Sequence, residues 1–479
     1  MAESKRTVLI NKLLCLITER NQIGDQFDER GFTLLETVCD GLQNMSAGNV
    51  VSILSKSWLC IGSCDFANGL EYCQAALDYV WEELNTGYWK DVDICWRKAY
   101  TLSTFLKVLC QIGICESRNE VFKTCDMGLL MGAPVHKNVL VKVMMVLQEA
   151  EFSFQEHESS LAECTEVFVD NNLENNRKMK VPIKRKWRDE LNDGTASKEI
   201  NVGGIEKVQL QESSALQNDK SATEKKEGLE IFVSADRYPF GLAGSRSIER
   251  ISNPSLQNFY TNFMIKSTPV VIENAISHWP AMSERRWSVN YIKKKAGHRT
   301  VPIEIGGRYT SEDWTQKLLT INEFIDHYIT DNSDKGYLAQ HQLFDQIPEL
   351  RNDICIPDYC CLGDENNDAM VNAWFGPCGT VSPLHHDPYQ NLFAQVIGKK
   401  YIRIYDLKYS ENVYPHESHL LDNTSQVDVE EPDLEKYPLF SHAPYMECIV
   451  NEGDLLYIPK KFWHFVRSLS LSFSVSFWW

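Results

Sequence analysis

The run from Ser468 to Phe477 limits the fold of this chain more narrowly than any other stretch. Five apolar residues alternate there with five serines; they are Leu469, Leu471, Phe473, Val475 and Phe477. Successive side chains of a β-strand point to opposite faces, so a strict period of two predicts a strand with one buried face. The sequence therefore predicts that the chain ends in β-sheet.

A motif upstream of this run combines residue types that bind metals. The segment WFGPCGTVSPLHHDPYQN contains His385, His386 and Asp387 in succession. In an extended strand His385 and Asp387 project to one side and His386 to the other. A distant histidine, His464 in GDLLYIPKKFWHFV, also has a strand-like setting. Two imidazoles and one carboxylate match the facial triad of non-haem iron(II) oxygenases. His-Xaa-Asp alone is a weak pattern, and a surface turn is its alternative.

The first third of the chain has helical periodicity. In LEYCQAALDYVWEEL, apolar residues recur at three- and four-residue spacing; they are Leu70, Cys73, Leu77, Val80, Trp81 and Leu84. Such a stripe predicts the core face of an amphipathic helix. We expect residues 1–165 to form an all-α domain, either a bundle or a repeat-like array, although no repeat period is evident. Its expected role is a scaffold that recruits chromatin-associated proteins.

Residues 166–228 differ in composition and predict a disordered linker. They are rich in Asn, Lys, Glu, Ser and Gly, and they contain too little apolar surface to offset the entropy of ordering. Seven basic residues lie between Arg177 and Arg188. This cluster predicts a nuclear import signal, with a solvated charge run as an equal alternative. We expect a nuclear protein, with a cytoplasmic pool as the further possibility.

Global composition excludes several classes of protein. With 43% hydrophobic and 24% charged residues, the 479-residue chain reads as globular, and no signal peptide or membrane span is evident. A net charge of −18 argues against broad or sequence-specific nucleic-acid binding and is compatible with basic protein substrates. Fifteen cysteines without framework spacing favour reduced thiols.

Residues 229–479 have the pattern of a β-rich domain with short strands. The most informative segment, NLFAQVIGKKYIRIY, predicts a hairpin in which a turn at Gly398 and Lys399 pairs Ile397 with Lys400. That register places Asn391 and Lys400 on one apolar face. An inward lysine is costly to bury unless an anion meets it, so we expect an anion site near the metal.

These motifs resemble the Jumonji C family. The resemblance rests on GYLAQHQLFDQIPEL, NAWFGPCGTVSPLHHDP and the terminal LSFSVSFWW. It implies an α+β protein with a C-terminal double-stranded β-helix (cupin or jelly-roll) barrel after the all-α N-terminal domain. It also implies a catalytic centre that uses Fe(II), 2-oxoglutarate and O2, with iron bound by His385, Asp387 and His464. The implied 2-oxoglutarate contacts are Tyr337, Ser382, Asn391 and Lys400, of which Lys400 pairs with the distal carboxylate. Trp374 is expected to line that pocket, with aromatic core packing as the alternative.

The resemblance implies a dioxygenase that acts on proteins. The first expectation is C-hydroxylation of arginine, with Glu304 and Trp314 at the mouth of the pocket. A carboxylate accepts a guanidinium in bidentate geometry, and an aromatic ring stacks on its plane. The alternative is that neither residue binds substrate, with Glu304 a solvent-exposed strand residue and Trp314 an aromatic residue of the core. The second expectation is demethylation of a histone H3 methyl-lysine. Histone-tail endopeptidase activity ranks below both, because the sequence contains no HExxH motif. A non-enzymatic cupin-like binding module also ranks below both, because a barrel that only binds a partner does not need an inward-facing lysine.

Overall fold

The computed structural model describes residues 2–18, 41–42, 47–87, 91–136, 138–149, 245–307, 309–310, 314–330, 335–363, 368–418 and 421–479. The predicted linker and the basic cluster between Arg177 and Arg188 lie outside the described residues. The domain boundaries on either side of the linker therefore stay predictions.

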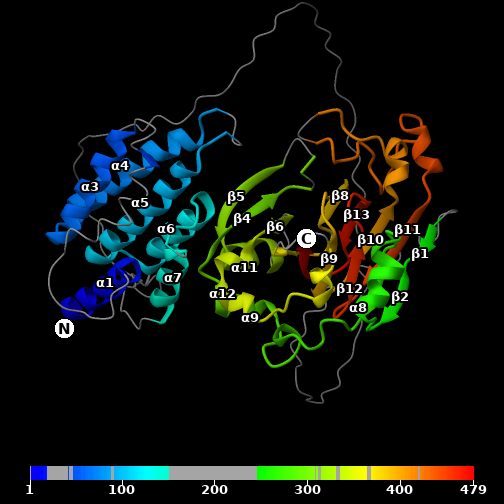
Figure 1. Ribbon diagram of the computed structural model, residues 1–479, viewed down its shortest axis with the longest axis horizontal. Helices are drawn as coiled ribbons and strands as arrows, with labels where there is room; N and C mark the ends of the chain where they lie inside the picture. Colours follow the sequence, from blue (N-terminus) through cyan, green and yellow to red (C-terminus); the bar gives the residue numbers. More distant parts are fainter. Residues whose placement is uncertain are drawn as a thin grey trace, which may run out of the picture. The chain divides into compact units, whose positions relative to one another are not determined.

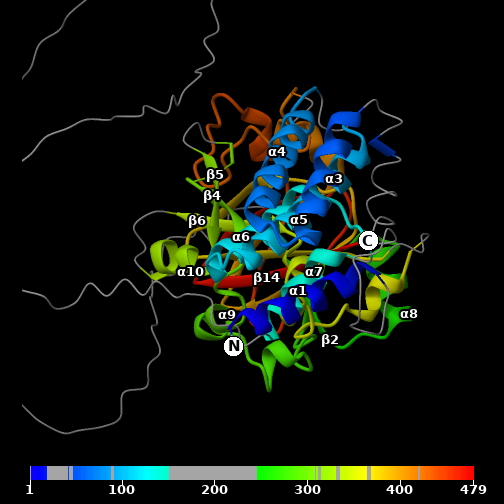
Figure 2. The same cartoon turned by 90° about the vertical axis from the view of Figure 1, so that its left-hand side faces the viewer.

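The N-terminal region is helical, as the periodicity predicts. Its helices are α1 (Ala2–Thr18), α3 (Gly48–Gly62), α4 (Phe66–Leu84), α5 (Ile94–Gly113), α6 (Arg118–Met131) and α7 (Val139–Glu149). Side chains cap three of them, because Asp65, Asp93 and Ser117 accept hydrogen bonds from the first backbone N–H groups of α4, α5 and α6. Helix α5 packs on α3, α4 and α6 and is buried on nearly every side (Figure 2).

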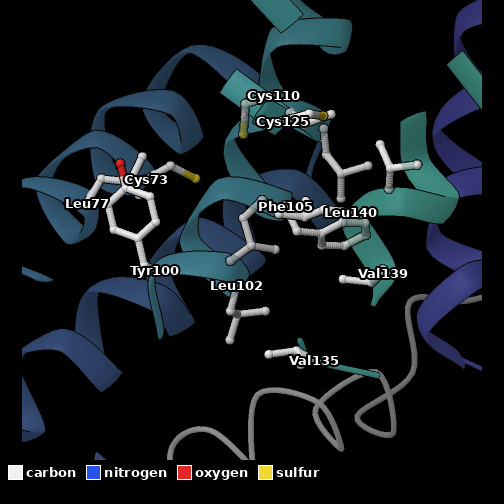
Figure 3. Packing of buried hydrophobic residues seen from close by; sticks show 14 of the residues in the cluster. Cys73, Leu77, Tyr100, Leu102, Phe105, Cys110, Cys125, Val135, Val139 and Leu140 are labelled. Carbon is white, nitrogen blue, oxygen red and sulfur yellow. The ribbon is translucent and has the colours of Figure 1, made fainter. Parts of the chain in front are cut away.

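The core of this helical region forms around α5. Leu102, Phe105 and Cys110 of α5 belong to one buried cluster with Val139 and Leu140 of α7 (Figure 3). The predicted stripe on α4 is correct for Cys73, Leu77 and Val80, which are buried. It is wrong for Trp81, whose side chain is 42% exposed. All the cysteines in the described residues are free thiols.

The C-terminal region is a barrel of two sheets (Figure 1). The five-stranded sheet has the order β1-β11-β10-β13-β8, with β1 (Ser245–Ser247), β8 (Val381–His385), β10 (Lys400–Tyr405), β11 (Tyr445–Val450) and β13 (Trp463–Ser468). The nine-stranded sheet has the order β2-β3-β12-β9-β14-β7-β6-β4-β5. Its strands are β2 (Glu249–Ser252), β3 (Val270–Glu273), β4 (Thr300–Ile305), β5 (Thr315–Thr320), β6 (Gly336–His341), β7 (Met370–Gly376), β9 (Asn391–Ile397), β12 (Leu455–Ile458) and β14 (Ser472–Trp478).

Two apolar layers hold the barrel together. One lies between the sheets and includes Phe393 of β9 with Ile402 and Ile404 of β10. The other covers the outer face of the nine-stranded sheet, where short helices pack; they are α8 (Leu256–Phe259), α9 (Val289–Ala296), α10 (Ile321–Phe324), α11 (Leu343–Gln346) and α12 (Pro348–Arg351). Two-sided burial of this kind confirms the expected α+β fold with a cupin barrel. No helix of the described residues is long and apolar enough to span a membrane.

The predicted hairpin between β9 and β10 is wrong. Strand β9 pairs with β12 and β14, whereas β10 pairs with β11 and β13, so the two strands lie in different sheets. Gly398, with φ of 73°, turns the chain from one sheet to the other, and a Cβ atom there would lie 1.9 Å from the Leu471 carbonyl oxygen. The corner still directs Lys400 and Phe393 into the space between the sheets, as the predicted register did.

The terminal alternating run also differs from its prediction. Strand β14 starts only at Ser472, and both of its faces are buried, with Phe473, Val475 and Phe477 in the apolar layer on the outer face of the sheet. Its serines are partners for polar groups within the barrel. Ser474 Oγ donates to Gln395 Oε1 at 2.8 Å, and Trp374 Nε1 donates to Ser476 Oγ at 2.9 Å. A serine face therefore does not indicate a solvent face here.

Candidate metal and cosubstrate site

The structure brings His385, Asp387 and His464 together. His385 ends β8 and is the register partner of His464 in the antiparallel strand β13, and Asp387 follows two residues after β8 ends. One ligand atom from each side chain lies within 4.8 Å of the others. His464 Nε2 lies 3.6 Å from Asp387 Oδ2. The arrangement is a compact N,N,O donor set on adjacent strands.

Backbone carbonyls fix the orientation of both imidazoles. His385 Nδ1 donates to the Pro383 carbonyl at 2.7 Å, and His464 Nδ1 donates to the Phe462 carbonyl at 3.0 Å. Each neutral ring thus keeps an unprotonated Nε2 as a potential metal ligand. Burial, followed by the proximity of His385, lowers the pKa of His464 to about 4. His464 is therefore neutral at physiological pH, as a divalent metal requires, and the donor set fits Fe(II).

His386 lies apart from this group, in agreement with the strand-face prediction. Its ring meets the Trp463 ring edge-on, with centroids 4.7 Å apart. Its backbone N–H donates to the Asn423 carbonyl. The side chain packs against an aromatic ring, and it is not part of the group of potential metal ligands in the described residues.

Lys400 is a buried cation at the start of β10. It is 1% exposed, its Nζ atom donates to the Tyr337 hydroxyl at 3.1 Å, and the ring of Phe393 lies 5.2 Å away. Burial lowers the pKa of Lys400 to about 7. Within the described residues no carboxylate forms an ion pair with it. A buried ammonium without a counter-ion favours a site for an anionic ligand.

Of the other predicted cosubstrate residues, Tyr337 contacts Lys400 directly, and Tyr337 in turn lies next to Ser382 and Trp374. Tyr337 hydrogen-bonds Ser382, and burial raises the pKa of Tyr337. The Trp374 ring lies 6.2 Å from the Tyr337 ring. Asn391 is 4% exposed, and its Oδ1 atom has no hydrogen-bond partner. Because the two ends of an amide interchange by rotation, Asn391 can turn an N–H donor toward a carboxylate. These polar groups fit a dicarboxylate such as 2-oxoglutarate.

Glu304 and Trp314 interact directly. Trp314, just before β5, donates a side-chain hydrogen bond to Glu304 of β4, and burial raises the pKa of Glu304. Trp314 is 36% exposed and so is not a core aromatic, while Glu304 is only partly exposed. Glu304 is also the register partner of Tyr337 on β6, which places it next to the cosubstrate residues. Glu304 is therefore not a fully solvent-exposed strand residue, and Trp314 is not a core residue, so both alternatives from the sequence are wrong.

The sequence prediction missed Tyr309. Its hydroxyl lies 3.2 Å from Thr424 Oγ1, and Thr424 pairs with His385. Burial, with smaller contributions from the nearby carboxylates of Asp387 and Glu304, raises the pKa of Tyr309 to about 12. Tyr309 thus lies between the triad and Glu304. The only signal in the sequence is its place in a Gly-rich loop directly after the strand that carries Glu304.

Comparisons with known proteins agree with this geometry. Residues 256–479 match the cupin-like domain family, and residues 61–160 match the N-terminal ARM repeats of KDM8-like proteins. The helical region therefore contains repeats that periodicity did not reveal. The chain is 43% identical to "Lysine-specific demethylase 8" of Xenopus tropicalis, over 87% of this chain and 90% of that protein. It is 42% identical to the protein of that name in Danio rerio, over 85% and 87%. It is 44% identical to "Jumonji C domain-containing protein 5" of Drosophila melanogaster, over 48% and 59%.

Proposed function

Because this chain belongs to the Jumonji C family that includes lysine-specific demethylase 8, we propose that it is an Fe(II)- and 2-oxoglutarate-dependent oxygenase that oxidises a cationic side chain of a protein. The observation that carries the proposal is the convergence of His385, Asp387 and His464, together with the uncompensated Lys400 on β10, the strand that pairs with the His464 strand β13. A metal site and an anion site next to each other are what this chemistry requires.

The proposed roles follow from the donor atoms. His385 and His464 would hold iron through Nε2 and Asp387 through a carboxylate oxygen, leaving positions for cosubstrate and oxygen. Lys400, Tyr337 and Asn391 would hold the carboxylates of 2-oxoglutarate, with Ser382 orienting Tyr337 and Trp374 lining the pocket. When bound, iron and 2-oxoglutarate would couple O2 reduction and formation of succinate and CO2 to oxidation of a substrate C–H bond.

The mouth of the site favours arginine as the oxidised residue. Glu304 is a partly buried carboxylate paired in register with Tyr337, and the Trp314 side chain is held on it by a hydrogen bond. A carboxylate can accept two parallel N–H donors of a guanidinium, and a planar cation stacks on an indole. A methylated ammonium would ordinarily be held by several aromatic rings. C-hydroxylation of arginine is the function that this geometry supports best.

The comparisons favour a second candidate, the demethylation of methyl-lysine. Two of the reported relatives carry the printed name "Lysine-specific demethylase 8" and match over most of both chains. Oxidation of an N-methyl carbon uses the same iron and cosubstrate, so the triad and Lys400 serve either reaction. The protein substrate would be a histone tail, and we propose nuclear localisation and recruitment through the helical region as part of this reading.

Mass spectrometry distinguishes the two reactions. The full chain, with Fe(II), 2-oxoglutarate and O2, is incubated with basic peptides that contain both arginine and methylated lysine. Gain of one oxygen on arginine supports hydroxylation, and loss of a methyl group from lysine supports demethylation. The His385→Ala variant should abolish either product, whereas His386→Ala should retain it. Peptide cleavage without oxidation, or no modification with succinate also absent, would contradict the proposal.

A further inference from the structure

A carboxylate of the helical region, Asp126, forms hydrogen bonds with the residues at the start of β4. Asp126 of α6 is 0% exposed, and Arg299, the residue before β4, is 1% exposed. Asp126 Oδ1 accepts from Arg299 Nε at 3.0 Å and from Arg299 Nη2 at 2.8 Å. The fork geometry of this pair fixes orientation as well as distance. It is a fully buried ion pair between residues 173 positions apart in the chain.

The same carboxylate also holds the backbone of β4. Asp126 Oδ2 accepts from the Thr300 N–H at 2.7 Å. The Thr300 carbonyl accepts from Gln346 Nε2 at 2.8 Å, and that same amide group donates to Asp126 Oδ1 at 2.8 Å. Both backbone hydrogen-bonding groups of Thr300 are therefore fixed by side chains. Without Asp126, the Thr300 N–H and the Arg299 guanidinium would lose their common acceptor.

The other end of β4 lies at the proposed substrate site. Glu304 stands four residues after Thr300 and shares its face of the strand, because side chains alternate. Val301 and Ile303, on the opposite face, are fully buried in the apolar layer that covers the outer face of the nine-stranded sheet. Strand β4 meets β6 only through Glu304 and Ile305. Along the rest of that edge, Asp126 and Gln346 take the place of a neighbouring strand.

A second residue of α6, Lys123, acts electrostatically on the helix that follows β5. The positive charge of Lys123 contributes to lowering the pKa of Glu323, after the hydrogen bonds that Glu323 receives at the capping box of α10. Helix α10 follows β5, and its first residue Ile321 donates to the Arg299 carbonyl at 2.9 Å. Helix α6 thus packs directly on β4, while α10 links the end of β5 to the residue before β4.

From this geometry we propose that Asp126 is a positioning residue for β4 and, through it, for Glu304. The inference rests on the proposed role of Glu304 in binding a cationic side chain. The ARM-repeat region then acts in the reaction by fixing the substrate-binding strand, in addition to any recruitment. The hydrogen-bond partners of Asp126 are Arg299, Thr300 and Gln346, none of which is proposed to hold iron or cosubstrate, so loss of Asp126 should leave 2-oxoglutarate binding intact.

Two variants of the full chain test this positioning. Asp126→Asn removes the charge and offers an N–H where an acceptor is needed. The pair Asp126→Leu with Arg299→Met removes both charges together, and such apolar replacements of a buried pair are often neutral for stability. It keeps the test valid where Asp126→Asn fails to fold. Glu120→Gln is the matched control, because Glu120 carries the same charge on the same helix and is exposed.

Three quantities are measured on each variant in the presence of Fe(II). In hydrogen-deuterium exchange, we expect the amides of β4 to lose protection while those of β8 and β13 keep it. In steady-state assays, we expect the peptide KM to rise about 3- to 30-fold, the range for coupling through such a network. The dissociation constant of 2-oxoglutarate should stay within about twofold of the wild-type value. Glu120→Gln should match the wild type in all three.

The outcomes separate this inference from the proposed function. If the β4 amides of the double variant exchange as slowly as those of the wild type, the positioning role is overturned. It is also overturned if the β4 amides lose protection from exchange while the peptide KM stays unchanged. A uniform loss of protection across the barrel would reduce Asp126 to a general structural residue and also contradict the inference. If the wild-type chain oxidises no peptide, the proposed function fails on its own, and the exchange measurement still decides whether Asp126 positions β4.

Discussion

Lys400 Nζ lies 3.1 Å from the Tyr337 hydroxyl oxygen, inside a barrel where the described residues offer this cation no carboxylate. The two side chains come from different sheets, β10 and β6. An ammonium in this position is stabilised by a bound anion and destabilised without one. Ligand binding and protonation are therefore linked at Lys400.

Replacement of Lys400 by Met should weaken 2-oxoglutarate binding by about 30-fold or more, since removal of one partner of a buried charge pair costs about 2 kcal/mol or more. Iron affinity should change little. The ligand-free variant should be at least as stable as the wild type, because an uncompensated buried charge is gone. Calorimetry and thermal unfolding measure the two effects. Lys399→Met, at the exposed neighbouring position, is the control. Equal 2-oxoglutarate affinity in both variants would remove Lys400 from the cosubstrate site.

The pH dependence of 2-oxoglutarate binding should report the same lysine. Its pKa is about 7 in the ligand-free protein, and a bound carboxylate raises it. Above pH 7 binding must take up a proton, so affinity should fall by up to about tenfold per pH unit. Calorimetry in buffers of different ionisation enthalpy measures this uptake. Proton uptake that persists in Lys400→Met would assign the effect to another group.

The stability of the ligand-free protein should increase above pH 7, whereas its affinity for 2-oxoglutarate should decrease. The pKa of Lys400 is about 7 when folded and about 10.4 when unfolded, so between these values the unfolded state binds more protons. The free energy of unfolding should therefore gain a contribution from Lys400 as the pH rises above 7. Urea titrations of wild type and Lys400→Met isolate that contribution as their difference. A difference that does not vary with pH would contradict it.

The neighbouring histidines should differ sharply in iron binding. His385→Ala removes an Nε2 donor and should weaken Fe(II) binding by more than about 100-fold, beyond what loss of an outer contact costs. His386→Ala removes only the edge contact with Trp463 and should bind iron within a few-fold of wild type. Metal titration of the two purified variants gives the comparison. The reverse order of affinities would show that the strand-face argument is wrong.

Glu304 should act on the peptide and not on the cosubstrate. Glu304→Gln keeps the shape and loses the charge, so peptide kcat/KM should fall by about 30-fold, as for a buried charge pair that loses one member. The affinity for 2-oxoglutarate should stay unchanged. Glu284→Gln, on the surface, is the control. An unchanged peptide rate in Glu304→Gln would exclude Glu304 from substrate binding.

Trp314→Phe separates stacking from hydrogen bonding at the same position. The phenyl ring keeps an aromatic face but cannot donate a hydrogen bond to Glu304. We therefore expect peptide kcat/KM to fall by about 2- to 10-fold, the effect of one lost hydrogen bond, which is less than the loss expected for Glu304→Gln. Peptide kinetics measure it beside Trp314→Ala, which removes both interactions. Equal kinetics in the two variants would indicate that stacking contributes nothing.

Local sequence patterns predicted the metal-binding group correctly but gave a wrong prediction for the connection between β9 and β10. The convergence of His385, Asp387 and His464 followed from strand alternation and a recognisable motif, both of which are local. The hairpin failed because a Gly-Lys step between apolar segments suits either a hairpin or a corner between sheets. Only the later strands β12, β13 and β14 decide which, by taking the edges of β9 and β10.

Partners distant in the chain could not be predicted. Asp126 reads as an ordinary acidic residue of a helix, because Arg299 and Gln346 lie far along the sequence. Trp81 matched the apolar stripe of α4, yet periodicity does not show where packing against neighbouring helices stops. Tyr309 lies in a loop, and loops have no periodicity from which a side-chain direction follows.

The pairing of His385 with His464 across β8 and β13 makes the proposed iron site a property of the folded barrel alone. An unfolded chain has two separated imidazoles and no such site. Iron would then act as a ligand of the native state, adding about 2.7 kcal/mol to stability when its free concentration is a hundred times its dissociation constant. The melting temperature would rise with the iron supply, so a cell short of iron would hold less of the folded protein before any loss of turnover by the remainder.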